Sequence, residues 1–505
     1  MTTKYAGCVP SPAYLVIVLI LHASPLPVLS LLLWHWAVVG ATIAASAAAI
    51  LHVVLEKRDP RSAAYWLIIV FFVPLGGPIF YALFGVNFIR RKGRSYRESL
   101  TLANRHGGLA CPLPIDGDGA WHERDCVLAE TFVRLSRLTL TTGNELKILR
   151  NGDEAMPAML KAIEEAQTTV TLATYIFEAN GIGRDFITAL SAASRRGVEV
   201  RVMVDDAGTR YSWPPITKQL RDAGVPVRRF MPNRFIVRLL TMNLRNHRKI
   251  LVIDGKVGFT GGINIREGNM LSRQPSHPVQ DLHFRVTGPI VAQLQTLFSE
   301  DWFFCSGEAL EGDAWYPKLA TTGEVSAIGI PDGPDEDLEV MPQAIFAALT
   351  AARDHVHIVT PYFLPPPLLI SALRLCAIRG VEVSIVVPAR NNIPIVNWAA
   401  RTLYPELLEA GCKIYESPPP FDHSKLFVID GIWSFVGSTN WDPRSLRLNF
   451  ELNLACHDRV LSAALNAEFE RKLAISDEIT TALLRDAPLP IRLRNGLARL
   501  FIPLL

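Results

Sequence analysis

One spaced motif occurs twice in this chain, and it constrains the fold and the chemistry more than any other feature. Both copies read H-x-K-x4-D and continue, at the same distance, into two small residues and an asparagine. At average residue frequencies, the H-x-K-x4-D part alone should occur by chance in only about a few per cent of chains of this length. Two matching copies therefore indicate an internal duplication. The copies consist of His247, Lys249, Asp254, Gly261, Gly262 and Asn264, and of His423, Lys425, Asp430, Gly437, Ser438 and Asn440.

The repeat extends beyond the motif. The pentapeptide at 196–200 recurs unchanged at 379–383, and an aromatic pair precedes each copy, at Tyr175 and Tyr362 respectively. Matched elements in a fixed order are typical of duplicated domains, and the period is far too long for a solenoid. The sequence therefore predicts two α/β domains of one fold, packed face to face about a pseudo-twofold axis with a site between them. Each domain should be a mixed sheet flanked by helices.

The apolar runs at 250–253 and 426–429 predict strands that are buried on both faces. Residues i and i+2 of a strand point to the same side. His247 and Lys249 should therefore project together, and the same holds for the second copy. Asp-Gly follows each run, which predicts a turn. Short strands at 257–260 and 433–436 should then lead to the small residues, where the backbone can approach a ligand closely.

Two facing half-sites of this kind suit a phosphate diester. Phosphoryl transfer requires charge neutralisation on the non-bridging oxygens, a nucleophile, and an acid for the leaving group. Lys249 and Lys425 can neutralise the charge, and Asn264 and Asn440 can donate amide hydrogen bonds to phosphate. One imidazole can attack phosphorus while the other protonates the leaving group.

A nucleophilic imidazole also needs an acceptor on its far nitrogen, because that acceptor fixes the tautomer. The candidates are Asp281 and Glu451, each on a strand-like stretch beyond the asparagine of its own half. For Asp281, an ordinary carboxylate at a strand edge is the alternative.

These residues resemble the phospholipase D superfamily and, within it, the bacterial-type cardiolipin synthases. The resemblance implies that two phosphatidylglycerol molecules give cardiolipin and glycerol through a phosphatidyl-histidine. It also implies that Asp254 and Asp430, although part of the catalytic motif, support the fold and the pocket more than they react. The supporting stretches are 246–249, 261–264, 281–283, 288–289, 360–363, 436–440, 442–445 and 449–451.

The resemblance favours His247 as the nucleophile. The side chain of Asp281 is shorter than that of Glu451, so Asp281 is expected to hold the His247 ring more rigidly. The alternative activities are a phospholipase D or another phosphatidyltransferase with a different acceptor. A nuclease is opposed by the apolar N-terminus, and a catalytically dead lipid-binding protein by the intact His, Lys and Asn of both halves.

The N-terminal region predicts membrane association. Residues 36–55 are long and apolar enough to span a bilayer. Residues 63–84 form a second candidate span, for which the prolines and glycines favour a kinked or re-entrant helix as much as a straight one. Residues 14–33 could be a third span or a signal sequence. Five basic residues at 90–97 predict catalytic domains on the cytoplasmic side of a bacterial inner membrane, with several passes.

The expected organisation has six parts. The C-terminal part should be a membrane-surface helix or an amphipathic helix packed on the body. The parts are a membrane-anchoring region (1–95), a linker (96–140), the first catalytic domain (141–312), a connector (313–335), the second catalytic domain (336–480) and a basic amphipathic segment (481–505).

Composition narrows the partners. A net charge of +3 is too small to indicate nucleic-acid binding. The seven cysteines are scattered and show neither a disulfide framework nor metal-ligand spacing. We expect no metal and no cofactor, because the two lysines supply the cationic charge. The expected partners are a phospholipid substrate and a membrane, and the oligomeric state stays open.

Overall fold

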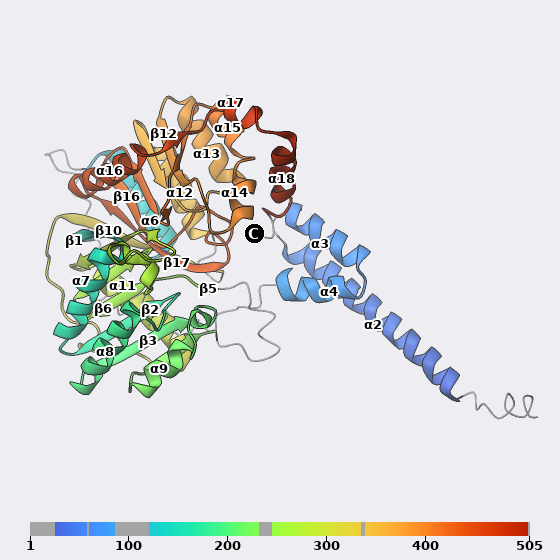
Figure 1. Ribbon diagram of the computed structural model, residues 1–505, viewed down its shortest axis with the longest axis horizontal. Coiled ribbons are helices and arrows are strands. Elements are labelled where there is room, and N and C mark those ends of the chain that lie inside the picture. Colours follow the sequence, from blue (N-terminus) through green and yellow to red (C-terminus); the bar gives the residue numbers. More distant parts are fainter. Residues whose placement is uncertain (1–25, 58–59, 86–120, 232–244, 335–338, 503–505) are drawn as a thin grey trace, which may run out of the picture. The chain divides into compact units, whose positions relative to one another are not determined.

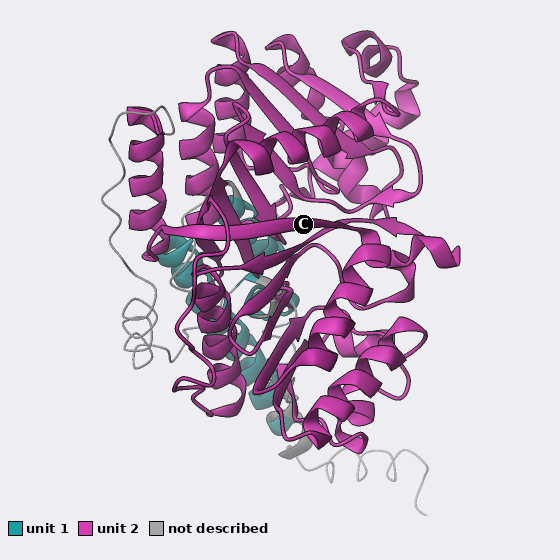
Figure 2. Cartoon of the chain, turned by 90° about the vertical axis from the view of Figure 1, so that its left-hand side faces the viewer, with its two compact units in different colours: residues 1–86 teal, residues 87–505 magenta. Residues whose placement is uncertain are grey.

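The computed structural model describes residues 26–57, 60–85, 121–231, 245–334 and 339–502. The chain divides into two compact units, residues 1–86 and 87–505 (Figure 2).

The described part of the first unit is helical. Among the described residues, one helix is long and apolar enough to cross a membrane, over Leu33–Glu56. The predicted second span at 63–84 is not one straight helix, because it breaks at residues 73–75, where Pro74 lacks a backbone donor. Of the predicted third span at 14–33, residues 26–33 belong to the first long helix and the rest lies outside the described residues. The elements are α2 (Leu26–Glu56), α3 (Pro60–Phe72), α4 (Gly76–Phe80) and the π-helix η1 (Tyr81–Gly85).

The broken second segment packs closely on itself and on α2. A Cβ atom at Gly77 would lie 2.5 Å from the carbonyl oxygen of Ile69, so only glycine allows this approach of α4 to α3. The His52 Nδ1 and Tyr81 Oη atoms lie 2.7 Å apart and link α2 to η1. The small core of this unit consists of Ala49, Val53, Trp66, Val70 and Tyr81.

The second unit is built on one continuous sheet whose strand order is symmetric (Figure 1). Its first half consists of β1 (Thr141–Arg150), β2 (Thr169–Thr174), β3 (Glu199–Asp205), β4 (Val227–Phe230), β6 (Ile250–Ile253), β7 (Val257–Gly261) and β9 (Leu282–Thr287). Its second half consists of β10 (Val325–Asp332), β11 (His355–Val359), β12 (Glu382–Pro388), β13 (Lys413–Ser417), β15 (Leu426–Ile429), β16 (Trp433–Gly437), β17 (Asn449–His457) and β18 (Asp477–Glu478).

The strand order demonstrates the duplication. It runs β18-β13-β12-β11-β15-β16-β17-β10-β1-β9-β7-β6-β2-β3-β4, so apart from the edge strand β18 the order in one half matches that in the other, outward from the antiparallel β10·β1 pair. The predicted pair of α/β domains is therefore confirmed. The halves do not stack face to face, however, because β1 and β10 join them edge to edge into one sheet.

Helices cover both faces of this sheet. On one face, α11 (Val291–Ser306) and α16 (Arg459–Leu473) share a core that extends across both halves. On the other face, α7 (Asn151–Glu165), α8 (Ile182–Arg195) and α9 (Ile216–Asp222) cover the first half. There, α6 (Glu123–Ser136), α12 (Val340–Ala351), α13 (Pro367–Ile378), α14 (Pro394–Ala400) and α15 (Tyr404–Glu409) cover the second half.

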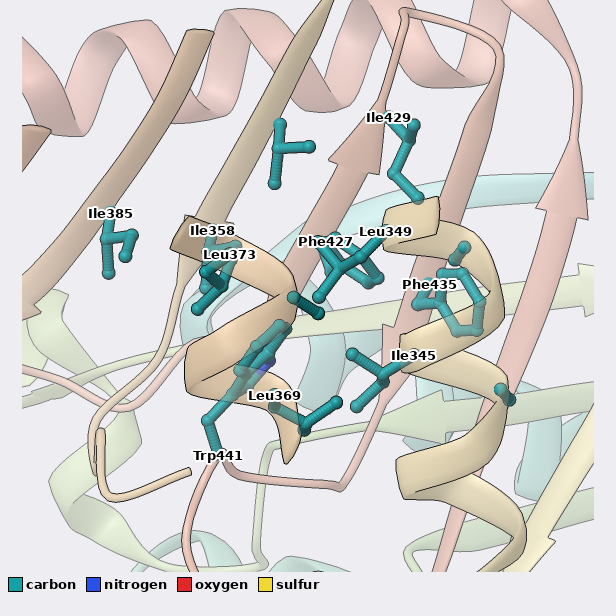
Figure 3. Close-up of a cluster of buried hydrophobic side chains, with 14 of the residues drawn as sticks. Ile345, Leu349, Ile358, Leu369, Leu373, Ile385, Phe427, Ile429, Phe435 and Trp441 are labelled. Carbon is teal, nitrogen blue, oxygen red and sulfur yellow. The ribbon is translucent and has the colours of Figure 1, made fainter. Parts of the chain in front are cut away.

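The motif strands are buried on both faces, as predicted. Ile250 and Val252 belong to the core under α11, whereas Leu251 and Ile253 belong to the core under α7 and α8. In the second half, Phe427 faces α12 and α13 in the same manner (Figure 3). Alternation of two apolar faces is the reason that these runs contain no polar residue.

The segments predicted as a linker and as a connector both contribute to the fold of the second half. The predicted connector at 313–335 contains β10, the strand that completes the second half as β1 completes the first. The predicted linker at 96–140 contains α6, whose Phe132 ring packs edge-on against Trp433 at 5.3 Å between centroids. Both predictions are wrong for these elements.

The remaining elements are short and flank the site or end the chain. They are η3 (Gly208–Tyr211), β5 (Arg245–Asn246), η4 (Glu267–Asn269), η5 (Leu271–Arg273), β8 (Val279–Gln280), β14 (Phe421–Asp422), α17 (Thr481–Arg485) and α18 (Leu489–Arg499).

Candidate active site

Two short strands cross between the halves and set the geometry of the site. β5 pairs in parallel with β17 of the second half, and β14 pairs in parallel with β8 of the first half. Phe450 lies opposite Asn246, and Asp422 lies opposite Gln280. One residue further along, His247 therefore comes beside Glu451, and His423 comes beside Asp281.

Each histidine is consequently held by the carboxylate of the other half. The His247 Nδ1 and Glu451 Oε2 atoms lie 3.0 Å apart, and the His423 Nδ1 and Asp281 Oδ2 atoms lie 2.7 Å apart. The prediction that Asp281 would hold His247 is wrong, because the chain crosses to the other half immediately before each histidine. Local spacing could not reveal this exchange.

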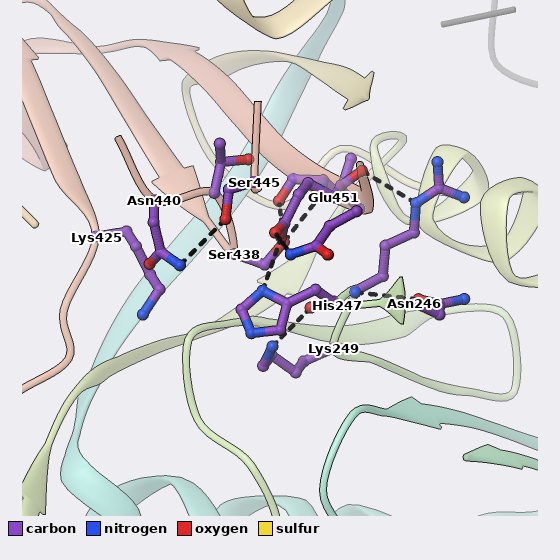
Figure 4. Close-up of polar contacts among 12 residues, drawn as sticks. Asn246, His247, Lys249, Lys425, Ser438, Asn440, Ser445 and Glu451 are labelled. Atoms are coloured by element: carbon purple, nitrogen blue, oxygen red, sulfur yellow. Dashed lines mark hydrogen bonds and ion pairs between the residues drawn. The ribbon is translucent and has the colours of Figure 1, made fainter. Parts of the chain in front are cut away.

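The two imidazoles face each other across the site. Their ring centroids lie 6.5 Å apart and their planes are nearly perpendicular, at 83°. The lysines lie beside them: Lys249 Nζ donates to the His247 carbonyl oxygen at 2.6 Å, and Lys425 Nζ lies 2.8 Å from His423 Nδ1. Figure 4 shows His247 directed at Glu451, with Lys249 beneath it. The halves thus place both His–Lys pairs in one buried cluster.

Burial changes the protonation of these groups. It lowers the pKa of Lys249 to about 7 and that of Lys425 to about 8, although the nearby carboxylates Glu451 and Asp281 act in the opposite direction. It also lowers the pKa of both histidines, that of His423 strongly, so the unliganded site favours neutral imidazoles. Cations that are this poorly solvated would gain from an incoming anion.

The two carboxylates differ in their protonation. Burial alone would raise the pKa of Glu451, but His247 and Lys249 outweigh it and the pKa lies below its usual range. Ser438 Oγ and Asn449 Nδ2 also donate to this carboxylate, at 2.5 and 3.1 Å. For Asp281, burial dominates over Lys425 and raises the pKa to about 6. Glu451 is therefore the more firmly ionised of the two.

The motif asparagines lie among the buried polar residues, at 7 % exposure for Asn264 and 4 % for Asn440. Asn264 Oδ1 accepts a hydrogen bond from the Ile176 backbone at 3.0 Å, which fixes the orientation of its amide. Asn440 Nδ2 donates to Ser445 Oγ at 3.1 Å. Each amide nitrogen carries two hydrogens, so each retains a donor for a ligand.

Comparison with known proteins identifies the family. A family model described as "Cardiolipin synthase, PLD-like domain" matches residues 159–302 and 345–473, and one described as "Phospholipase_D-nuclease N-terminal" matches residues 44–85. The chain belongs to the PLD-like cardiolipin synthase family. This confirms the resemblance recognised in the sequence, and with it an enzyme that transfers phosphatidyl groups.

Relatives in this family match over nearly their whole length. A cardiolipin synthase of Geobacillus sp. (strain WCH70) is 33% identical over 462 residues, which cover 89% of this chain and 90% of that protein. One from Oceanobacillus iheyensis is 32% identical, over 91% of this chain and 97% of that protein. A crystal structure of phosphatidylserine synthase from Haemophilus influenzae Rd KW20 shares the fold, with a TM-score of 0.57 at 14% identity. The match covers 75% of this chain and 100% of that one.

The motif aspartates lie away from the histidines. Asp254 follows β6, at the end opposite Lys249, and its carboxylate accepts hydrogen bonds from the backbone of Gln167, Thr168 and Thr169. Asp430 does the same for residues 353–355 and also pairs with Arg124 at 3.0 Å. Their contacts are those of groups that hold the motif strand to its neighbour. These contacts match the supporting role that the family resemblance implies for Asp254 and Asp430.

The site also contains residues that were not predicted from the sequence to belong to it. The Tyr175 ring lies 5.4 Å from the His247 ring, and the Tyr362 ring lies 6.2 Å from that of His423. Both tyrosines occur at matched positions in the two halves, and this repetition was the sequence signal that could have marked them as site residues. Arg248, fully buried, donates to the Glu451 carbonyl oxygen and pairs with Asp301 at 3.0 Å, so it holds β17 beside the site.

Proposed function

We propose that this chain joins two phosphatidylglycerol molecules into cardiolipin and releases glycerol, through a phosphatidyl-histidine. One observation carries the proposal: His247 and His423 face each other at 6.5 Å, and each has its Nδ1 held by a carboxylate. A nucleophile and a proton donor on opposite sides of one phosphorus are what a two-step transfer needs. Family membership supports the substrate class.

We propose His247 as the nucleophile, for a reason different from the one the sequence suggested. The ionised Glu451 accepts the Nδ1 hydrogen of His247, which leaves the Nε2 lone pair to attack phosphorus. The phosphorus–oxygen bond to the leaving glycerol then breaks. The anionic phosphodiester favours protonation of His423 when it enters the site. The Nδ1 hydrogen of the protonated ring then pairs with Asp281, and its Nε2 hydrogen passes to the departing glycerol oxygen.

The second step reverses the roles. The terminal hydroxyl of a second phosphatidylglycerol gives its proton to His423 as its oxygen attacks the phosphorus. The phosphorus–nitrogen bond to His247 breaks and cardiolipin leaves. Lys425, 2.8 Å from His423 Nδ1, disfavours the protonated ring and so promotes release of the proton in the first step.

Lysine and asparagine side chains would stabilise the transferred phosphate. Lys249 and Lys425 are buried cations, and charge neutralisation in a poorly solvated site is worth more than in water. Asn264 and Asn440 would add amide donors from the two sides. We assign phosphate binding to these four residues.

We also propose a multi-pass location in a bacterial inner membrane, with the catalytic halves in the cytoplasm. The apolar span at Leu33–Glu56, the shorter apolar helix at 62–72 and the basic residues at 90–97 support it. Within the catalytic body, we place the two halves at 141–312 and 336–480, and we add β10 to the second.

The test is the product formed by the purified full-length protein in detergent with phosphatidylglycerol alone. We expect cardiolipin and glycerol in equal amounts, with activity retained in a chelator because the two lysines supply the positive charge. A protein with both histidines replaced by alanine is the control. Accumulation of phosphatidic acid without cardiolipin would make the chain a phospholipase D instead.

A further inference from the structure

The C-terminal helix α18 has two different faces. Leu489, Leu493, Leu497 and Leu500 follow one another at intervals of four, four and three residues, which places them on a single stripe. All four side chains are between 56% and 65% exposed. A leucine stripe of this kind on a helix surface calls for a partner.

The opposite face of α18 attaches the helix to the catalytic body. Ala498 is buried at 4%, and Ile502 packs against the core of the second half. The Arg494 guanidinium lies over the Trp398 ring of α14, 4.5 Å from its centroid. The helix is thus fixed in place by one side, and this fixes the direction in which the leucines point.

The charges beside the stripe identify its partner. Helix α18 contains no acidic residue, and besides Arg494, which lies over Trp398, its charged residues are Arg492 and Arg499. Leucines flanked by arginines fit an anionic lipid surface, where the apolar stripe enters the acyl boundary and the arginines meet phosphates. A protein partner with a matching apolar groove would not account for a helix whose charged residues are all arginines.

We infer that α18 is a second membrane-docking surface, which sets the catalytic body on anionic lipid independently of the N-terminal helices. The contacts of α14 connect it to the site. Asn391, just before α14, donates to the Pro361 carbonyl oxygen at 2.7 Å, and Asn392 accepts from Tyr362 Oη at 2.8 Å. Tyr362 lies beside His423. Docking by α18 would therefore position the His423 side of the site relative to the bilayer.

Hydrogen exchange of the full-length protein in lipid nanodiscs tests the inference without requiring catalysis. We expect amides at 489–499 to exchange on the order of tenfold more slowly in phosphatidylglycerol discs than in phosphatidylcholine discs. The amides of α16 should not change. Equal exchange in the two lipids would overturn the inference. Protection that depends on protein concentration, with two chains per particle, would identify a second copy as the partner and also overturn it.

A double variant, Leu493→Glu with Leu497→Glu, gives a second readout. These side chains are exposed, so the fold should be retained. We expect the lipid-dependent protection to disappear and turnover of vesicle phosphatidylglycerol to fall by about tenfold. Turnover of a short-chain, monomeric phosphatidylglycerol should not change. The matched control is Val460→Glu with Ile475→Glu, two exposed apolar residues elsewhere on the body. Equal losses in the two variants would refute a specific docking role.

Discussion

Replacement of Glu451 by glutamine should disable His247 and leave His423 intact. Glu451 is fully buried, and its carboxylate lies 3.0 Å from His247 Nδ1. Glutamine keeps the shape but removes the negative charge. Attack by His247 on phosphorus leaves positive charge on its ring, in a site where Lys249 and Lys425 already disfavour it. The variant therefore loses the counter-charge of the phosphatidyl-histidine.

The structure gives the size of this loss. At an effective dielectric constant of about 20, a unit charge at this distance contributes about 5 kcal/mol. That corresponds to a decrease of roughly 10³- to 10⁴-fold in the rate of adduct formation. Ser438 donates to Oε2 of the carboxylate and Asn449 to Oε1, whereas glutamine keeps only one oxygen, so the variant should lose about one buried hydrogen bond, or about 1–3 kcal/mol of stability.

The assay is rapid-quench measurement of phosphatidyl-enzyme formation with a p-nitrophenyl phosphodiester of the lipid. Its leaving group departs without a proton, so the step reports on the nucleophile alone. Asp281→Asn is the matched control, because it makes the same change beside His423. It should slow turnover of phosphatidylglycerol but not adduct formation with the activated ester. A normal rate of adduct formation in Glu451→Gln, or the reverse pattern in the two variants, would refute the crossed arrangement.

Three further predictions follow from the same geometry. With pKa values of about 7 for Lys249 and 8 for Lys425, kcat/KM should fall as the pH rises through 7 to 8 and the lysines lose protons. The decline in kcat should come at higher pH, because bound phosphate stabilises their protonated forms; coincident declines in the pH–rate profiles would contradict this assignment. Asp254→Ala should lower the free energy of unfolding by about 2–3 kcal/mol, because the carboxylate bonds three consecutive backbone amides, as thermal denaturation would show. The pKa of Asp254 is lowered by these bonds against its burial, so this stabilisation is present above its unfolded pKa and is lost as the pH falls through the lower folded value. Removal of residues 1–91 should leave a cooperatively folded protein, since the described cores of the catalytic halves contain no residue from that segment. Its turnover on vesicles should be reduced. Full activity of the truncated protein would show that the N-terminal helices are not needed to reach the lipid.

The sequence predicted the elements that depend on local pattern. The apolar runs marked β6 and β15 at their observed bounds, and the repeated motif identified the two histidines that the fold brings together. Strand β10 was mistaken for a connector because Pro331, Gly333 and Pro334 read as a turn. Its pairing with β1 and β17 joins residues far apart in the chain, and such pairing leaves no local signal.

The exchange of carboxylates between the halves was missed for the same reason. Asp281 and Glu451 were recognised as candidates by their position after each asparagine. The parallel strand pairings β5·β17 and β14·β8 decide which histidine each carboxylate holds. Each pairing consists of only two opposed residue pairs. Strands this short carry no periodicity that a sequence pattern could detect.

The location of the covalent adduct tests the central claim most directly. His247→Ala and His423→Ala proteins would be quenched with the p-nitrophenyl phosphodiester and analysed by peptide mass spectrometry. We predict a phosphatidyl group on His247 in the His423→Ala protein, no adduct in the His247→Ala protein, and no turnover of phosphatidylglycerol in either. An adduct on His423 in the His247→Ala protein would reverse the two roles, and retained turnover in either variant would contradict a mechanism that needs both histidines.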